Sequence, residues 1–485
     1  MMKKVLKVIT NEYVILLGLI VLAFLVRFYK IDNPIADWHS FRQADTASVS
    51  RVYVEEGINI LIPRYHDVSS IQSGWDNPKG YRFVELPLYN VIHAGLVKVI
   101  PIFTLEVWGR LLSIISSLIS GLILYLLGKR FIGKWGGLLA FFFFAFIPYN
   151  IYFSRVILPE PLATTLALGG LLLFVRYIDS GKRTLFYISA VVFALSILVK
   201  PFTVFYFIPI FYLYIDKYGL KRILTAKHII PLSLYGLIMA IPFLAWRTWI
   251  NDYSAGIPFV KWVFNGNIIR FRPAFWRWIF GERLGRLILG IWGILPFTLG
   301  ILWVKRKGKY FIHSFLLGMF LYVSVVATAN VQHDYYQVFI IPAVSLALAQ
   351  GSVFLLRTRI FPQVLAKGML VFSVMMMMGI GLYQVKEYYK INHPEIIVAG
   401  QAVDKLVPKD ARVIAPYNGD TAFLYQTKRW GWPAVDDSIE NIIRRGASYY
   451  VSVNLHDKDT EYVRENYEVI EETDSYIIID LSKEK

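Results

Sequence analysis

The 485-residue chain contains no cysteine. This absence excludes structural disulfides, thiolate metal sites and cysteine nucleophiles. Charged residues are also scarce, since Asp, Glu, Lys and Arg make up 18% of the chain whereas 56% of its residues are hydrophobic. Together with a mean hydropathy of +0.50, this composition indicates an integral membrane protein rather than a soluble one.

Acidic residues are few in most of the chain and common only near its end. Residues 391–485 contain 11 Lys and Arg against 17 Asp and Glu, whereas the preceding 390 residues contain 40 against 17. A basic membrane part favours contact with lipid headgroups or with an anionic lipid-linked ligand. We expect no nucleic-acid partner, because the basic residues lie in short loops rather than in one patch.

Apolar runs of about the length that crosses a bilayer recur along the chain. They lie near 13–29, 106–128, 135–150, 160–177, 184–199, 201–216, 229–246, 286–304, 312–329, 337–355 and 367–384. The basic loops "KRFIGK", "DSGKR", "KYGLKR", "KRKGK" and "RTRIF" alternate with loops poor in Lys and Arg. This alternation predicts that these loops and the N-terminal "MMKK" are cytoplasmic and that the C-terminus is extracytoplasmic.

Two apolar segments need separate interpretation. No small-residue cleavage site follows the first run, so we expect a retained first span in the plasma or inner membrane of the cell. The segment 86–103 is short and polar at His93 and Lys98, which favours a half-inserted or surface-lying helix on the outer side. A hairpin of two short crossings is the alternative, so the predicted number of spans is 11 to 13.

Two long segments are predicted on the outer side of a membrane domain that covers residues 1–384. These are 30–86 and the aromatic, Arg-rich segment 247–285. Residues 385–485 alternate short apolar runs such as "ARVIA", "ASYYVSV" and "SYIIIDL" with helical patterns, which predicts a small extracytoplasmic α/β domain with a largely parallel sheet. No Gly-rich phosphate loop occurs there, so nucleotide binding is unsupported. Trp430 and Trp432 are candidates for exposed acceptor contacts.

Carboxylates stand at the predicted outer ends of two spans. Asp45 precedes a short amphipathic pattern, where it is either a helix N-cap or a functional acid. Glu160, next to Pro161, is either a helix-start carboxylate or a second functional acid. Lys200 interrupts an apolar run, where it either extends toward the interface or neutralises a phosphate.

These residue types suit transfer of a sugar from a lipid phosphate. A carboxylate can take the proton of an acceptor hydroxyl, while Arg or Lys stabilises the phosphate that leaves the sugar carbon. His333 has no second histidine ligand near it in the sequence, which argues against a metal site there. The two candidate carboxylates could help to hold Mg²⁺ or Mn²⁺, but two are too few to define a site.

Several strings resemble a family of integral-membrane glycosyltransferases, the protein O-mannosyltransferases and the lipid A aminoarabinose transferases. They are "HSFRQADTASVSRVYVEEGINILIPRYH", "YRFVELPLYNVIHAGLVKVI", "GRLLSIISSLISGLILYLLGKRFIGKWGGLLAFFFFAFIPYNIYFSRVILPEPLA" and "LVKPF". The resemblance covers residues 10–350 loosely and 35–205 well. It implies the GT-C fold, a polyprenyl-phosphate-linked sugar donor, no nucleotide, and transfer with inversion on the outer face.

Carried over by position, the resemblance places Asp45 in the acidic motif of the first loop, Glu160 at the second acidic position and Lys200 near the lipid phosphate. The chain departs from relatives that have an adjacent Asp-Glu pair, since it reads Arg42-Gln43 there. The base is therefore open between Asp45 and Asp37.

The predicted site comprises three groups of residues. The candidate acids are Asp45, Glu160 and Asp37. The candidate donor-phosphate ligands are Arg42, Arg51, Arg155, Lys200, Arg270 and Arg272. The candidate substrate-lining residues are His39, Gln43, Glu85, His333, Tyr335 and Tyr336.

The predicted activity is a hexosyl or pentosyl transfer in the cell envelope to a glycan, lipid or protein acceptor, with membrane lipids as further partners. A transporter or flippase of lipid-linked sugars is the alternative. It should bury charge in the middle of its spans and show repeated halves, whereas here the charges gather at span ends. An inactive scaffold whose C-terminal domain recruits partners is a third possibility.

Overall fold

The computed structural model of the chain describes residues 11–304 and 310–485. The predicted cytoplasmic segments "MMKK" and "KRKGK" lie outside these ranges. The described residues form two compact units. The helical unit comprises residues up to Ile31, Leu111–Trp246 and Val260–Glu387, and the second unit comprises Asp32–Arg110, Arg247–Phe259 and Tyr388–Lys485.

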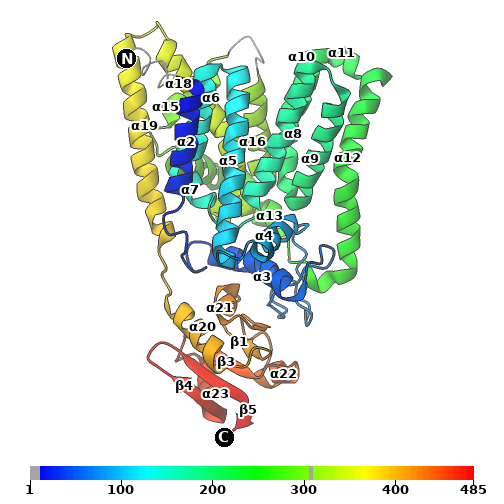
Figure 1. The fold of residues 1–485 in the computed structure, drawn as a ribbon, viewed down its shortest axis with the longest axis vertical. Coiled ribbons are helices and arrows are strands. Elements are labelled where there is room, and N and C mark those ends of the chain that lie inside the picture. The colour runs from blue at the N-terminus through cyan, green and yellow to red at the C-terminus, as the bar shows by residue number, and fades with distance from the viewer. Residues whose placement is uncertain (1–10, 305–309) are drawn as a thin grey trace. The chain divides into compact units, whose positions relative to one another are not determined.

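The helical unit is built from apolar helices that run side by side (Figure 1). Its longer helices are α2 (Glu12–Val26), α5 (Leu105–Phe131), α6 (Lys134–Phe146), α8 (Glu160–Ser180), α9 (Arg183–Val199), α10 (Phe207–Tyr218), α12 (Ala226–Ile250), α15 (Ile294–Leu302), α16 (Phe311–Val325), α18 (Ile341–Arg357) and α19 (Gln363–Val385). Helices suit this setting because each satisfies its backbone polar groups internally.

Short helical segments connect and extend these helices. They are α7 (Pro148–Phe153), η1 (Pro201–Tyr206), α11 (Leu220–Ile223), η2 (Asn251–Gly256), α13 (Trp262–Asn265), η3 (Gly266–Phe271), α14 (Pro273–Trp276), η4 (Arg277–Ile288), α17 (Ala327–Gln332), η5 (Asp334–Ile340) and η6 (Lys386–Tyr389). The helical unit contains most of these segments, while η2 belongs to the second unit.

Every predicted span coincides with a helical segment of the structure. Five stretches are long and apolar enough to cross a membrane, and four shorter apolar helices accompany them among the described residues. Five predicted spans pass from one helical element to another: 135–150 from α6 to α7, 201–216 from η1 to α10, 312–329 from α16 to α17 and 337–355 from η5 to α18, while 286–304 is broken between η4 and α15. At that break Gly290 adopts φ +48°, which an L side chain rarely does. The count of 11 to 13 spans stays a prediction.

The segment 86–103 contains one helix, α4 (Leu88–Val99), of 12 residues. At about 1.5 Å per residue it is about 18 Å long, too short to cross a bilayer core of about 30 Å. The structure therefore has the single short helix of the first interpretation, not the hairpin of the alternative.

The second unit contains α3 (Ser40–Glu56), α4 and the C-terminal α/β part. The latter consists of α20 (Glu395–Leu406), β1 (Arg412–Ile414), α21 (Thr421–Thr427), β2 (Trp430–Trp432), α22 (Ile439–Arg444), β3 (Tyr449–Ser452), α23 (Lys458–Asn466), β4 (Tyr467–Glu472) and β5 (Ile477–Glu484). The strands form one sheet in the order β2-β1-β3-β5-β4.

The expectation of a largely parallel sheet is wrong. β1 pairs in parallel with β2 and β3, but β5 pairs antiparallel with both β3 and β4. The short turn between β4 and β5 can only join antiparallel neighbours, because a parallel pair needs a longer crossover. The sheet is therefore mixed.

The first loop and the C-terminal sheet share one core. Val68 packs in the same cluster as Ile414 and Trp432, and its amide donates to the Gly431 carbonyl at 2.9 Å. The Gly431 amide in turn donates to the carbonyl of His66 at 2.9 Å. Trp432 is 1% exposed, so the idea that it is an exposed acceptor contact is wrong: its ring fills the core instead.

Candidate functional site

Helix α3 carries most of the predicted first-loop residues. It begins at Ser40 after His39, whose backbone is left-handed at φ 56° and whose ring meets Trp38 and Phe41 edge-on. Asp45 therefore lies in the second turn of the helix, and the N-cap interpretation of Asp45 is wrong. The helix is also longer than the predicted amphipathic stretch.

Asp45 is buried and engaged on both carboxylate oxygens. Oδ2 accepts from Nη2 of Arg82, and Oδ1 accepts from Oγ1 of Thr421 at 2.7 Å. Asp45 is 3% exposed and Arg82 8%. An arginine and a hydroxyl thus hold this carboxylate in a fixed orientation, and burial strengthens both interactions relative to water.

A second carboxylate–arginine pair lies in the same small pocket. Arg42 donates through Nη2 to Oε1 of Glu85 at 2.6 Å. Asn90 fixes the backbone beneath by donating to the carbonyl of Thr46 at 2.7 Å. Together with its open mouth, the pocket has a volume of about 270 Å³, and it is lined by Arg42, Asp45, Thr46, Val49, Pro63, Arg82, Val84, Glu85, Pro87 and Asn90.

The alternative base, Asp37, is hydrogen-bonded to a glutamine of α3. Oδ1 of Asp37 accepts from Nε2 of Gln43 at 2.8 Å, and the same Gln43 nitrogen reaches the carbonyl of Trp38 at 3.2 Å. Asp37 is not among the residues that line the pocket of Asp45. The structure therefore places only one of the two candidate bases in that pocket.

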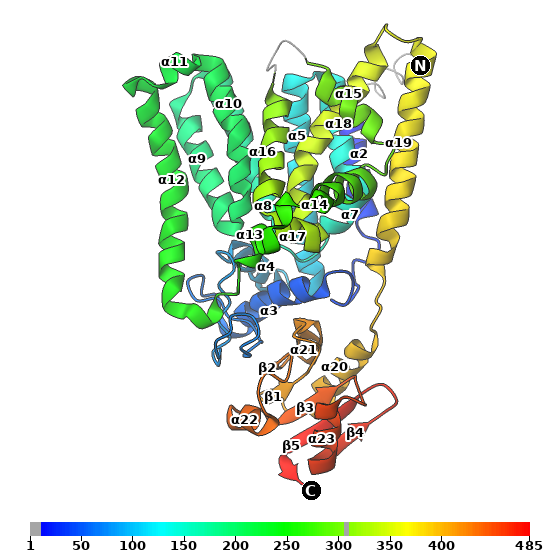
Figure 2. The same cartoon turned by 180° about the vertical axis from the view of Figure 1, so that it is seen from behind.

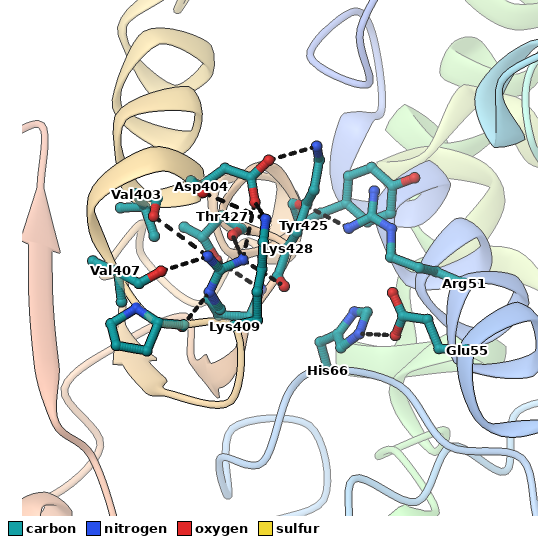
Figure 3. Close-up of polar contacts among 12 residues, drawn as sticks. Arg51, Glu55, His66, Val403, Asp404, Val407, Lys409, Tyr425, Thr427 and Lys428 are labelled. Carbon is teal, nitrogen blue, oxygen red and sulfur yellow. Dashed lines mark hydrogen bonds and ion pairs between the residues drawn. The ribbon is translucent and has the colours of Figure 1, made fainter.

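Arg51 is held by groups from the same unit (Figure 3). Its guanidinium lies 3.6 Å from the centre of the Tyr425 ring, donates to the Tyr425 carbonyl at 2.8 Å and reaches Oε1 of Glu106 at 3.4 Å. The Tyr425 hydroxyl donates to the same Glu106 oxygen at 2.5 Å. These contacts give Arg51 a role in joining α3 to α21.

His66 has a buried ring beside the same face of α3 (Figure 3). Its Nε2 lies 3.5 Å from Oε2 of Glu55, and its Nδ1 lies 2.9 Å from Oγ of Ser48. Burial lowers the pKa of His66 despite the neighbouring Glu55 carboxylate. The imidazole is therefore favoured in its neutral form.

In the helical unit, Glu160 and Lys200 form a buried ion pair. Glu160 begins α8, with Pro161 in its first turn, and Lys200 follows the last residue of α9. Nζ of Lys200 lies 2.7 Å from Oε1 of Glu160, and the two side chains are 5% and 0% exposed. The prediction that Glu160 stands at a helix start is confirmed, and its charge partner is the predicted Lys200. Arg155, also fully buried, donates to the carbonyl of Lys30.

The remaining predicted residues lie elsewhere in the helical unit. Arg270 and Arg272 donate to the backbone carbonyls of Val325 at 3.5 Å and Asn267 at 3.0 Å. The His333 ring stacks on the ring of Tyr335, and Tyr335 stacks on Tyr336 at 4.5 Å between centroids. The roles predicted for these five residues stay predictions.

Sequence reasoning did not single out Arg82 or Thr421, the two partners of Asp45. Arg82 stands in the string "YRFVELP", three residues before Glu85, so its position in a recognised motif was the available signal. Thr421 is 376 residues from Asp45 and offers no such signal. Among the described residues, no group of three or more His, Asp or Glu comes close enough together to hold a metal ion.

Comparisons with known proteins agree with this architecture. The family model of dolichyl-phosphate-mannose-protein mannosyltransferases matches residues 87–246. ArnT from Cupriavidus metallidurans is similar in structure: bound to undecaprenyl phosphate, it is 12% identical with a TM-score of 0.62, and in the apo state it is 11% identical with a TM-score of 0.66. Both matches cover 96% of this chain and 97% of the other.

A second kind of solved structure is also similar. The archaeal oligosaccharyltransferase AglB from Archaeoglobus fulgidus, in complex with an inhibitory peptide and a dolichol-phosphate, is 12% identical with a TM-score of 0.53. The match covers 94% of this chain and 72% of that chain. No curated protein sequence matches the chain. The predicted fold, a helical membrane protein of the GT-C type with a small C-terminal sheet domain, is confirmed.

Proposed function

We propose that this chain, which has the GT-C fold and matches the protein-mannosyltransferase family model over residues 87–246, transfers a sugar from a polyprenyl-phosphate donor to an acceptor hydroxyl. The observation that carries the proposal is the pocket in which Asp45 and Glu85 are each paired with an arginine. The binding of undecaprenyl phosphate by ArnT and of a dolichol-phosphate by AglB supports a lipid-linked donor here.

In the proposed reaction the acceptor oxygen attacks the anomeric carbon of the sugar. The hydroxyl proton passes to the Asp45 carboxylate, the bond between the anomeric carbon and the phosphate oxygen breaks, and the lipid phosphate leaves with the bonding electrons. A single displacement of this kind inverts the anomeric centre. Asp45 is favoured over Asp37 as the base because only Asp45 lines the pocket.

The positive groups of the chain would stabilise the leaving phosphate. Arg42 and Arg82 line the pocket, and their planar guanidinium groups suit bidentate contact with phosphate oxygens. Glu85 and Asp45 neutralise the charges of these two buried arginines. Independently of this pocket, the sequence resemblance supports the proposal that Lys200, which is paired with Glu160, binds the lipid phosphate.

The test is turnover by the full-length chain in lipid nanodiscs, with a panel of hexosyl and pentosyl polyprenyl phosphates and with glycan, lipid and protein acceptors. Released polyprenyl phosphate and the anomer of the product are measured. Asp45→Asn should lower kcat by about 10²-fold or more, the usual contribution of a general base. Glu56→Gln is the matched control, because Glu56 lies on the same helix but is exposed.

Two results would contradict parts of the proposal. Wild-type turnover by Asp45→Asn together with loss in Asp37→Asn would transfer the role of base to Asp37. Movement of the lipid-linked sugar across the bilayer without any release of polyprenyl phosphate would favour the transporter instead.

We also propose that the reaction takes place on the outer face. The chain contains no cysteine, so a single introduced cysteine can be labelled specifically. The label is a membrane-impermeant maleimide applied to intact cells. Ser475→Cys, in the turn after β4, should be labelled from outside, and Lys182→Cys, in a basic loop, should be labelled only after lysis. The reverse result would place the reaction on the cytoplasmic face.

A further inference from the structure

Helices α8 and α9 carry the Glu160–Lys200 pair at one end, and a large pocket lies at their other end. That pair marks the start of α8 and the end of α9, whereas the pocket contains Tyr177 near the end of α8 and Arg183 at the start of α9. The 21 residues of α8 span about 30 Å, about the thickness of the bilayer hydrocarbon. The pocket therefore lies at the level of the lipid headgroups of one leaflet.

The pocket is formed by α8, α9, α10, α11 and α12, which are neighbours in Figure 1 and in the reverse view of Figure 2. With its open mouth it has a volume of about 1310 Å³. It is lined by Tyr177, Gly181, Arg183, Phe186, Tyr187, Tyr214, Tyr218, Arg222, Ala226, Lys227, His228, Ile230 and Pro231.

The charged residues that line this pocket are all basic. Arg183, Arg222 and Lys227 are exposed, and no lining residue is acidic. The nearby Asp179 is occupied, since its carboxylate accepts from Nε and Nη2 of Arg130 at 2.6–3.2 Å. Three cations converge on one concave space without a counter-charge in its wall, which favours an anionic ligand.

Phenolic hydroxyls add hydrogen-bonding groups beside these cations. The hydroxyls of Tyr177 and Tyr218 lie 2.8 Å apart. In such a pair one hydroxyl donates to the other, and the accepting hydroxyl keeps its own proton for a further acceptor. Cations, hydroxyl donors and aromatic walls together suit a phosphate ester better than a bare inorganic ion.

An apolar strip begins at the rim of the pocket and continues along α12. Ile230 belongs to the pocket lining, and Leu234, Leu237, Ile241 and Leu244 follow it at helical spacing, each more than 40% exposed. Such a strip on a helix of a membrane protein faces hydrocarbon. A ligand with its phosphate in the pocket could therefore lay acyl chains along this strip.

We propose that this pocket binds the phosphate of an anionic phospholipid, whose acyl chains lie along the exposed face of α12. This site is separate from the pocket of Asp45, because the two pockets share no residue and belong to different units of the chain. The occupant is a membrane lipid rather than a soluble phosphate ester, because the apolar strip continues directly from the charged pocket.

The test compares retention of phosphatidylglycerol with retention of phosphatidylcholine by the full chain in a non-ionic detergent, counted by native mass spectrometry. Arg183→Gln, Arg222→Gln and Lys227→Gln are combined in one variant. The matched control combines Arg176→Gln, Lys182→Gln and Lys221→Gln, which removes the same charge from exposed residues of the same helix ends outside the pocket.

Wild-type and control proteins should bind phosphatidylglycerol more tightly than phosphatidylcholine, and the pocket variant should lose about tenfold or more in affinity. Equal losses in the two variants would reveal diffuse attraction and overturn the proposal, as would no loss in either. Displacement of the lipid by millimolar glycerol 3-phosphate would also overturn it, in favour of a soluble ligand. Unchanged circular dichroism of both variants checks that they fold.

Discussion

The hydrogen bond from Thr421 to Asp45 is one of the two contacts that orient the proposed base, the other being the ion pair with Arg82. Replacing Thr421 with Val removes the hydroxyl and keeps the shape of the side chain. The bond is 2.7 Å long, and Thr421 is 5% and Asp45 3% exposed. A buried hydrogen bond to a charged group contributes about 1.5–3 kcal/mol. We therefore expect Thr421→Val to lower the free energy of unfolding by this amount.

A double-mutant cycle separates this bond from other effects of the substitution. With Asn at position 45 the Thr421 hydroxyl bonds to a neutral group, a contact that contributes only about 0.5–1.5 kcal/mol. The two substitutions should therefore be non-additive by about 1–2 kcal/mol. The assay is equilibrium unfolding of the full chain in detergent, monitored by the fluorescence of its 13 tryptophans, which include the buried Trp432. Thr421→Ser, which keeps the hydroxyl, is the control and should retain the coupling.

Additivity within about 0.5 kcal/mol would refute this reasoning, because it would show that the hydroxyl and the carboxylate do not interact. The same variants also probe sugar transfer. Thr421→Val should lower kcat and leave KM nearly unchanged, since Thr421 orients Asp45 without lining the pocket. Restoration of kcat in Thr421→Ser would identify Thr421 as a positioning residue.

Four further predictions concern other parts of the chain. Lys200→Met should destabilise the chain by about 3–5 kcal/mol by leaving Glu160 buried without a partner, and adding Glu160→Gln should restore thermal stability but not sugar transfer. Arg429→Met should cost about 1–3 kcal/mol in denaturant unfolding, because it leaves the backbone carbonyls of Pro408 and Val407 without their buried donor. Burial raises the pKa of Asp420 to about 6, so its proton is held more tightly in the folded state and stability falls as pH rises from about 4 to 6. Asp420→Asn should therefore exceed wild type in unfolding free energy by up to about 3 kcal/mol at pH 7 and by little at pH 4. Gly431→Ala should cost about 3 kcal/mol or more in thermal unfolding, since a Cβ there would lie 1.8 Å from a backbone carbonyl of β1.

The helices of the membrane part could be predicted because their signal is local. An apolar run of sufficient length has few alternatives to a helix in a bilayer, and every predicted span is helical in the structure. The C-terminal helices α20, α22 and α23 were equally visible from their periodicity. Strand β2 could not be predicted, because its three residues, Trp-Gly-Trp, are too few to show an alternating pattern and are followed directly by Pro433.

The partners of the candidate site residues could be predicted only in part. Lys200 and Glu160 were both identified because each is a charge at the end of an apolar run, a costly and therefore informative placement. The pairing of Asp45 with Arg82 depends on the path of an irregular loop, which carries no periodic signal. The contact with Thr421 depends on tertiary packing across 376 residues. Local patterns identified the charges, and only the folded chain shows how most of them are paired.

The packing of the first loop on the C-terminal sheet argues against a recruiting role for residues 388–485. Between α3 and α4 the loop has little regular structure, so its position must be fixed by contacts outside itself. Those contacts come from the C-terminal part: Val68 lies in the core of the sheet, Arg51 lies on the ring of Tyr425, and Thr421 bonds Asp45. A reacting carboxylate must be held to within about half an ångström. The C-terminal part is therefore better understood as the scaffold of the proposed catalytic loop.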